Sequence, residues 1–200
     1  MKFFVTGVGG QLGHDVMNEL IGRGHEGVGS DIQESYGGVA DGSAVTKAPY
    51  VALDITDRAA VERVITDVKP DAVIHCAAWT AVDLAEEPEK AEKVRAINVG
   101  GTQNMADACR KLGCKMTYIS TDYVFDGQGT EPWQPDCREI YRQAGYATQV
   151  VPVTTAEYGL SRAARPFNSR LDKRKLVEAG FTPLPTWQDA LSRYLKEIEK

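Results

Sequence analysis

The chain has 200 residues, of which 42% are hydrophobic and 26% are charged, which is enough to bury one substantial core. Its formal net charge of −5 argues against a general nucleic-acid-binding protein, because such proteins need an excess of lysine and arginine to neutralise phosphates. No apolar run approaches the roughly 20 residues that span a bilayer, and the first strand leads into a glycine turn instead of a secretory signal. We therefore expect a cytoplasmic protein with neither a nucleic-acid nor a membrane partner.

The first 120 residues alternate between apolar strands and amphipathic helices. Residues 2–6 form a short apolar run that ends at glycines, and Leu12, Val16 and Leu20 follow at helical spacing. Further strands are predicted at residues 25–30, 50–55, 72–78 and 115–120, and helices over 56–69 and 88–112. Strands separated by helices of this length need crossover connections. The predicted fold class is therefore α/β, a Rossmann-like doubly wound parallel sheet.

The alternation stops after this sheet. A Gly- and Pro-rich loop over 126–136 precedes a predicted helix over 138–144, a short strand over 149–153 and a closing helix from about Trp187 to Lys200. The predicted organisation is a Rossmann-like domain over residues 1–137 and a small C-terminal α/β segment over 138–200.

The segment Thr6-Gly-Val-Gly-Gly-Gln-Leu-Gly13 lies between the first strand and the first helix, where a nucleotide diphosphate can meet free helix N–H groups. Gly7 is predicted to permit the tight turn, Gly10 to admit a phosphate, and Gly13 to let the helix pack closely. A glycine pattern alone also fits an ordinary turn, but its place at the first strand-to-helix junction favours a dinucleotide site. The loop residues Gln11 and Leu12 are predicted to contact the same cofactor.

An acidic residue follows the second strand. Asp31 stands 18 residues after Gly13, close to the offset of about 20 residues expected for an acid that binds the adenosine ribose hydroxyls. This favours NAD over NADP, although a solvated turn aspartate remains the alternative. The neighbouring Ser30 offers a hydroxyl that would tolerate a 2′-phosphate, which keeps the use of both cofactors open.

Several motifs resemble the extended short-chain dehydrogenase/reductase family: the Gly-x-x-Gly-x-x-Gly spacing, Leu53-Asp54-Ile55 and Cys76-Ala77-Ala78. A narrower resemblance is to the dTDP-4-dehydrorhamnose reductase family. It is carried by AAWTAVD at 77–83, INVGGT at 97–102, STDYVFDG at 120–127, ARPFNSRLD at 164–172 and PTWQDAL at 185–191. The likeness covers nearly all of both parts of the chain.

The resemblance implies an enzyme that uses NADPH or NADH to reduce dTDP-4-dehydro-6-deoxy-L-mannose to dTDP-L-rhamnose. It implies that Thr121 polarises the substrate carbonyl. For cofactor binding it implies Asp54, Ile55, Ala77, Ala78 and Thr80, and for the dTDP-sugar Val82, Tyr123 and Arg165. The alternative for the two alanines is that they are small core residues.

The resemblance also bears on assembly and metals. A homodimer is common in the family, and some members bind Mg²⁺ at the interface through acidic residues. Only Asp15 occupies a comparable place in this sequence, so we predict no metal site.

The family's proton donor is missing. Its reaction uses a tyrosine and, one helical turn later, a lysine, in the pattern Tyr-x-x-x-Lys. None of the eight tyrosines has a lysine four residues later, and only Tyr158-Gly-Leu-Ser-Arg162 imitates the pattern, too close to Arg165-Pro166 for the catalytic helix. The chain passes from Cys137 directly to Arg138, where the family carries that helix. Two functions therefore stay open: the reductase, and a catalytically inactive dinucleotide- or sugar-nucleotide-binding module.

Overall fold

A computed structural model describes residues 1–37, 48–121 and 177–198. The chain divides into two compact units, Met1–Ser120 and Thr121–Lys200. The helix predicted over 138–144, the strand over 149–153 and the domain boundary at residue 137 lie outside the described residues and stay predictions.

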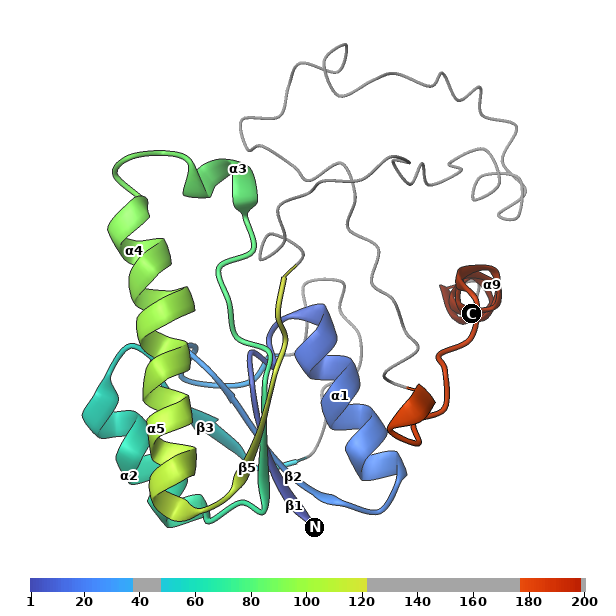
Figure 1. Ribbon diagram of the computed structural model, residues 1–200, viewed down its shortest axis with the longest axis horizontal. Helices are drawn as coiled ribbons and strands as arrows, with labels where there is room; N and C mark the ends of the chain where they lie inside the picture. Colours follow the sequence, from blue (N-terminus) through green and yellow to red (C-terminus); the bar gives the residue numbers. More distant parts are fainter. Residues whose placement is uncertain (38–47, 122–176, 199–200) are drawn as a thin grey trace. The chain divides into compact units, whose positions relative to one another are not determined.

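The described part of the first unit contains a sheet of five parallel strands in the order β3-β2-β1-β4-β5 (Figure 1). The strands are β1 (Lys2–Thr6), β2 (Glu26–Asp31), β3 (Tyr50–Ala52), β4 (Ala72–His75) and β5 (Lys115–Tyr118). In the register of the sheet Thr6 pairs with Ser30 on one side and with His75 on the other. The carboxyl ends of β1, β2 and β4 therefore meet at one edge, where the strand order changes direction and ligands of such folds bind.

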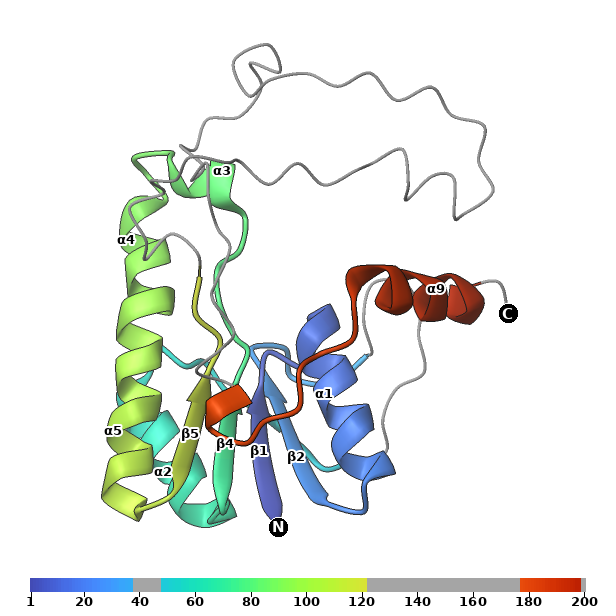
Figure 2. The same cartoon turned by 45° about the vertical axis from the view of Figure 1, so that its right-hand side comes forward.

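Helices cover both faces of this sheet, which confirms the doubly wound prediction. Helix α1 (Gln11–Gly22) lies on one face, and α2 (Arg58–Val68) and α5 (Thr102–Leu112) lie on the other (Figure 2). Alternate side chains of each strand point to opposite faces. Two buried cores result: one under α1 with Val5, Val8, Met17 and Leu20, and a larger one under α2 and α5 with Phe4, Val28, Val61, Ile65, Val73 and Met105.

The predicted helix over 88–112 is a series of three segments. α4 (Ala91–Arg95) runs into a π-helical segment, η1 (Ala96–Gly101), and then into α5. A Cβ atom on Gly101 would lie 2.6 Å from the Ile55 side chain, so glycine lets η1 approach the loop after β3 closely. The short helix α3 (Val82–Ala85) was not predicted. Helix α5 ends at Gly113, whose φ of +80° is the left-handed conformation typical of a helix C-terminus.

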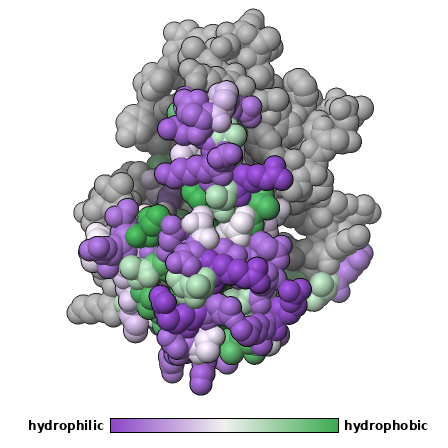
Figure 3. All heavy atoms as spheres, turned by 90° about the vertical axis from the view of Figure 1, so that its left-hand side faces the viewer, coloured by the Kyte–Doolittle hydropathy of each residue, from purple (hydrophilic) through white to green (hydrophobic). Residues whose placement is uncertain are grey.

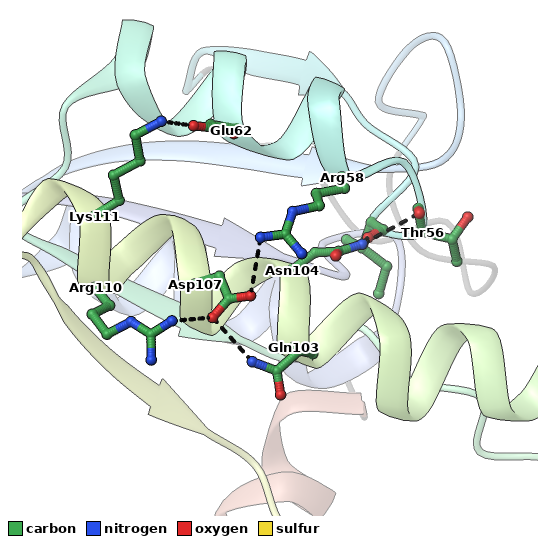
Figure 4. Close-up of polar contacts among 9 residues, drawn as sticks. Thr56, Arg58, Glu62, Gln103, Asn104, Asp107, Arg110 and Lys111 are labelled. Carbon is green, nitrogen blue, oxygen red and sulfur yellow. Dashed lines mark hydrogen bonds and ion pairs between the residues drawn. The ribbon is translucent and has the colours of Figure 1, made fainter.

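Polar contacts join α2 to α5. Asp107 accepts hydrogen bonds from Gln103 and Arg110 and pairs with Arg58 of α2, while Lys111 pairs with Glu62 (Figure 4). Hydrophilic residues predominate on the face seen in Figure 3, with apolar side chains interspersed. Arg58, Arg110 and Lys111 are largely exposed, so these contacts lie at the surface, outside the apolar core.

The second unit contributes α9 (Trp187–Ile198) to the described residues. The hydroxyl of Thr186 accepts a hydrogen bond from the Asp189 amide at 3.3 Å, which is the capping contact expected at the start of a helix. This confirms the closing helix predicted from Trp187. Throughout the described ranges, no helix combines the length and the apolar character that crossing a bilayer requires.

Candidate cofactor-binding site

The glycine turn connects β1 to α1 at the carboxyl edge of the sheet. Gly7 has a φ of +74°, and a Cβ atom there would lie 2.7 Å from the backbone nitrogen of Ala77. A Cβ atom on Gly13 would lie 2.6 Å from the carbonyl carbon of Gly7. Real side chains do not tolerate such distances to backbone atoms, so both positions require glycine. The roles predicted for Gly7 in the turn and for Gly13 in close helix packing agree with this geometry.

The N-terminus of α1 has no side-chain cap of its own, because its N-cap residue is Gly10. The first turn of the helix contains no acidic residue. Gly10, Gln11 and Leu12 are exposed. The first N–H groups of a helix have no partner within the helix, and the helix dipole is positive at this end. These features fit a diphosphate group, because backbone amides and dipole both favour an anion here.

Asp31 lies next to this turn. One carboxylate oxygen accepts a hydrogen bond from the Gly9 amide at 2.9 Å, and the other accepts one from the Ile32 amide at 2.7 Å. The carboxylate is half-buried and reaches the glycine turn from the end of β2. Ser30, in contrast, is 1% exposed, because the neighbouring side chain of a strand points to the opposite face. The prediction that Ser30 offers its hydroxyl to a 2′-phosphate is therefore wrong.

The segment after β3 carries the two residues predicted to flank adenine. Asp54 is exposed, and its carboxylate accepts hydrogen bonds from the backbone amide and the hydroxyl of Thr56, at 2.8 and 2.7 Å. Ile55 is 7% exposed and its side chain belongs to the core. Asn104 of α5 donates to the Ile55 carbonyl at 3.0 Å and to the carbonyl of Thr56 at 3.3 Å; Figure 4 shows Asn104 and Thr56. Because the side chain is buried, only the main chain of Ile55 is available for contact with a ligand.

A series of buried hydrogen bonds lies next to the contact between Gly7 and Ala77. The amide of Ala77 donates to the Thr6 hydroxyl at 3.2 Å, Thr6 shares a hydrogen bond with His75 Nδ1 at 2.8 Å, and His75 Nε2 lies 3.2 Å from the Thr102 hydroxyl. His75 is 1% exposed, and burial lowers its pKa from 6.5 to about 4. The imidazole is therefore neutral at pH 7 and ties β1, β4 and α5 together. His75 was not among the predicted site residues, although a polar residue inside an apolar strand was a signal in the sequence.

The loop after β4 is held by Asn98 of η1. The Trp79 amide donates to the Asn98 side-chain oxygen at 2.7 Å, and the Asn98 amide group donates to the Trp79 carbonyl at 3.1 Å. The predicted cofactor residues Ala78 and Thr80 flank Trp79 and are exposed, and Val82 is half-buried at the start of α3. The two-point contact therefore fixes the backbone that carries these residues.

Of the residues Thr121, Tyr123 and Arg165, which are predicted to act on the substrate, the structure describes Thr121. Thr121 is exposed and begins the second unit. Tyr123 and Arg165 lie outside the described residues. The roles of these three residues toward the sugar nucleotide stay predictions.

The model of the RmlD substrate binding domain family matches residues 1–138 and 136–200. The chain belongs to this family. The resemblance seen in the motifs is thereby confirmed, and the two matched segments meet where the sequence analysis places the missing stretch, after Cys137.

Individual relatives agree with this assignment. The dTDP-4-dehydrorhamnose reductase of Streptomyces griseus is 39% identical over 136 residues, which are 68% of this chain and 38% of that enzyme. The crystal structure of a dTDP-4-dehydrorhamnose reductase from Clostridium acetobutylicum is 38% identical with a TM-score of 0.53, over 66% of this chain and 40% of that one. The Bacillus anthracis enzyme in complex with NADP is 34% identical with a TM-score of 0.52, over 65% and 40%. The matched part of the chain thus spans less than half the length of these relatives.

Proposed function

We propose that this chain binds NADH or NADPH with the cofactor diphosphate at the N-terminus of α1. The observation that carries the proposal is the close contact of Gly7 with Ala77 and of Gly13 with Gly7, which leaves an exposed, uncapped helix end at the switch point of the sheet. The Bacillus anthracis relative, solved with NADP, supports the same class of cofactor.

Asp31 is proposed to bind the adenosine ribose. Its carboxylate stands beside the turn, and residues 30–37 contain no lysine or arginine to neutralise a 2′-phosphate. NADH should therefore bind more tightly than NADPH. Replacing Asp31 with Asn should bring the dissociation constants of NADH and NADPH closer together, because the neutral amide does not repel the 2′-phosphate. Calorimetric titration of both cofactors checks this, and an unchanged ratio of dissociation constants would contradict the assignment.

The proposed reaction is the reduction of dTDP-4-dehydro-6-deoxy-L-mannose to dTDP-L-rhamnose. The reduced cofactor supplies a hydride to the keto carbon when it is bound. The Thr121 hydroxyl is proposed to donate a hydrogen bond to the carbonyl oxygen, which gains a proton as the alcohol forms. Without the Tyr-x-x-x-Lys pair that proton comes from water, and general-acid assistance of about 10²- to 10⁴-fold is lost. Turnover by this chain should accordingly be slow.

A second candidate is a catalytically inactive module that binds a dinucleotide or a sugar nucleotide. The observation that favours it is the sequence itself, because no tyrosine stands four residues before a lysine. The family model also matches in two segments that meet at residues 136–138, the place where that helix is expected.

One pair of assays separates the candidates. NADH is titrated into the purified chain by calorimetry, and its oxidation is then followed with the keto sugar nucleotide present. Oxidation above the protein-free rate supports the reductase, whereas saturable binding without oxidation supports the module. The Gly13→Ala variant serves as the site-blocked control, and Gly22→Ala, at a helical position with open space around it, serves as the matched control. Absence of saturable binding of NADH, NADPH and the dTDP-sugar to the unaltered chain would overturn both candidates.

A further inference from the structure

The segment that follows Asp31 is fastened to α1 by one aromatic side chain. Tyr36 is half-buried, and its hydroxyl shares a hydrogen bond with Nδ1 of His14. His14 lies in the first turn of α1, directly after Gly13, and is 4% exposed. The bond therefore connects the helix that begins at the glycine turn with the segment that continues from the ribose-binding aspartate.

The contact made by the second imidazole nitrogen of His14 indicates which group donates in the hydrogen bond between His14 and Tyr36. Asn18, one turn further along α1, places its amide nitrogen 3.0 Å from His14 Nε2. An amide N–H can only donate, so Nε2 accepts and Nδ1 carries the proton that is donated to Tyr36. Burial raises the pKa of Tyr36, which keeps its hydroxyl neutral.

A second tyrosine continues the connection to Asp31. The ring of Tyr36 stacks on that of Tyr50, with centroids 5.9 Å apart and planes 20° apart. The Tyr50 hydroxyl donates to the carbonyl of Asp31 at 3.1 Å and to that of Gln33. Burial and the nearby negative charge of Asp31 raise the pKa of Tyr50, so this hydroxyl also keeps its proton. The backbone of Asp31 is thus held from β3 while its carboxylate accepts from Gly9.

We propose that Tyr36 and His14 are positioning residues that hold the ribose-binding carboxylate of Asp31 in register with the diphosphate-binding end of α1. The inference rests on the proposed cofactor function. Packing alone explains the ring of Tyr36, which lies against the core under α1, but it does not explain the hydroxyl, because phenylalanine would fill the same space. The hydroxyl joins the two elements that would grip opposite ends of the adenosine diphosphate, and a dinucleotide needs both at a fixed separation.

The test is cofactor affinity in Tyr36→Phe. This variant keeps the ring and its stacking on Tyr50 but removes the bond to His14. We expect the dissociation constant for NADH to rise about three- to tenfold, the usual effect of one hydrogen bond. In an Asp31→Asn background the same substitution should have a clearly smaller effect, since the positioned group is already altered. A purely structural role would lower the melting temperature and leave the dissociation constant unchanged.

A second pair of variants, at His14, tests the proposal independently of whether Tyr36→Phe folds. The amide of His14→Asn stands where Nδ1 stood and can keep the bond, whereas His14→Ala cannot. Affinity should therefore follow the order unaltered chain, His14→Asn, His14→Ala. If the unaltered chain binds NADH and all variants bind it equally, the positioning role is refuted while the cofactor function stands. If the unaltered chain does not bind NADH, the proposed function fails and the positioning role with it.

Discussion

The buried His75 should make the stability of the chain depend on pH. Its pKa is about 4 in the folded protein and 6.5 ordinarily. Between these values the unfolded chain binds a proton that the folded chain excludes, so stability is present at neutral pH and is lost as the pH falls. At about 1.36 kcal/mol per pH unit, the loss from pH 7 to pH 5 is about 2 kcal/mol.

Urea denaturation at pH 7 and pH 5 measures this loss, and His75→Gln isolates it. The glutamine side chain does not titrate, so the variant should be less stable at pH 7 yet lose about 2 kcal/mol less on acidification. Every other titratable group is common to the two proteins, so the contributions of these groups cancel in the comparison. Equal losses in the two proteins would show that His75 is protonated in the folded state and that the reasoning from burial is wrong.

Four further substitutions have defined outcomes. Gly13→Ala should abolish NADH binding in calorimetry, because its Cβ would collide with Gly7, whereas Gly22→Ala should bind normally and gain up to about 1 kcal/mol of stability. Asp57→Ala removes the cap of α2 and should lower the free energy of unfolding in urea by about 1 kcal/mol. Asp107→Ala should cost up to about 1 kcal/mol, and less in high salt, because its partners are charged surface groups.

The sheet was predictable because its signals are local and repeated. Apolar runs separated by amphipathic helices specify parallel strands, and α2 begins after its cap Asp57, close to the start predicted at residue 56. The carboxyl ends of the strands were not predicted well: β3 ends at Ala52 and β4 at His75, several residues before the apolar runs end. Beyond β3, Leu53 and Ile55 are apolar because they are buried in the core although they lie in a loop, and periodicity does not distinguish such a loop from a strand.

The site was predictable where the backbone geometry requires a particular residue type. Gly7 and Gly13 are such positions, because a side chain at either one would collide with backbone atoms. The contacts of Asn98 with Trp79 and of His14 with Tyr36 could not be predicted from the sequence. Each joins residues about 20 positions apart, and their proximity depends on the packed fold. Ser30 was misjudged for the same reason: its neighbour Asp31 is accessible, but the strand turns the serine inward.

Binding and turnover should be separable in this chain, because the residues proposed for each come from different places. Those proposed for the adenosine diphosphate lie between Gly7 and Ile55, whereas the family's Tyr-x-x-x-Lys pair, which acts at the nicotinamide end, is absent from the sequence. ADP-ribose, which lacks the nicotinamide, should therefore bind with nearly the affinity of NADH. Calorimetric titration of both ligands measures the difference. A preference for NADH of about tenfold or more, which corresponds to ~1.4 kcal/mol, would contradict this reasoning and mean that other residues of this chain hold the nicotinamide.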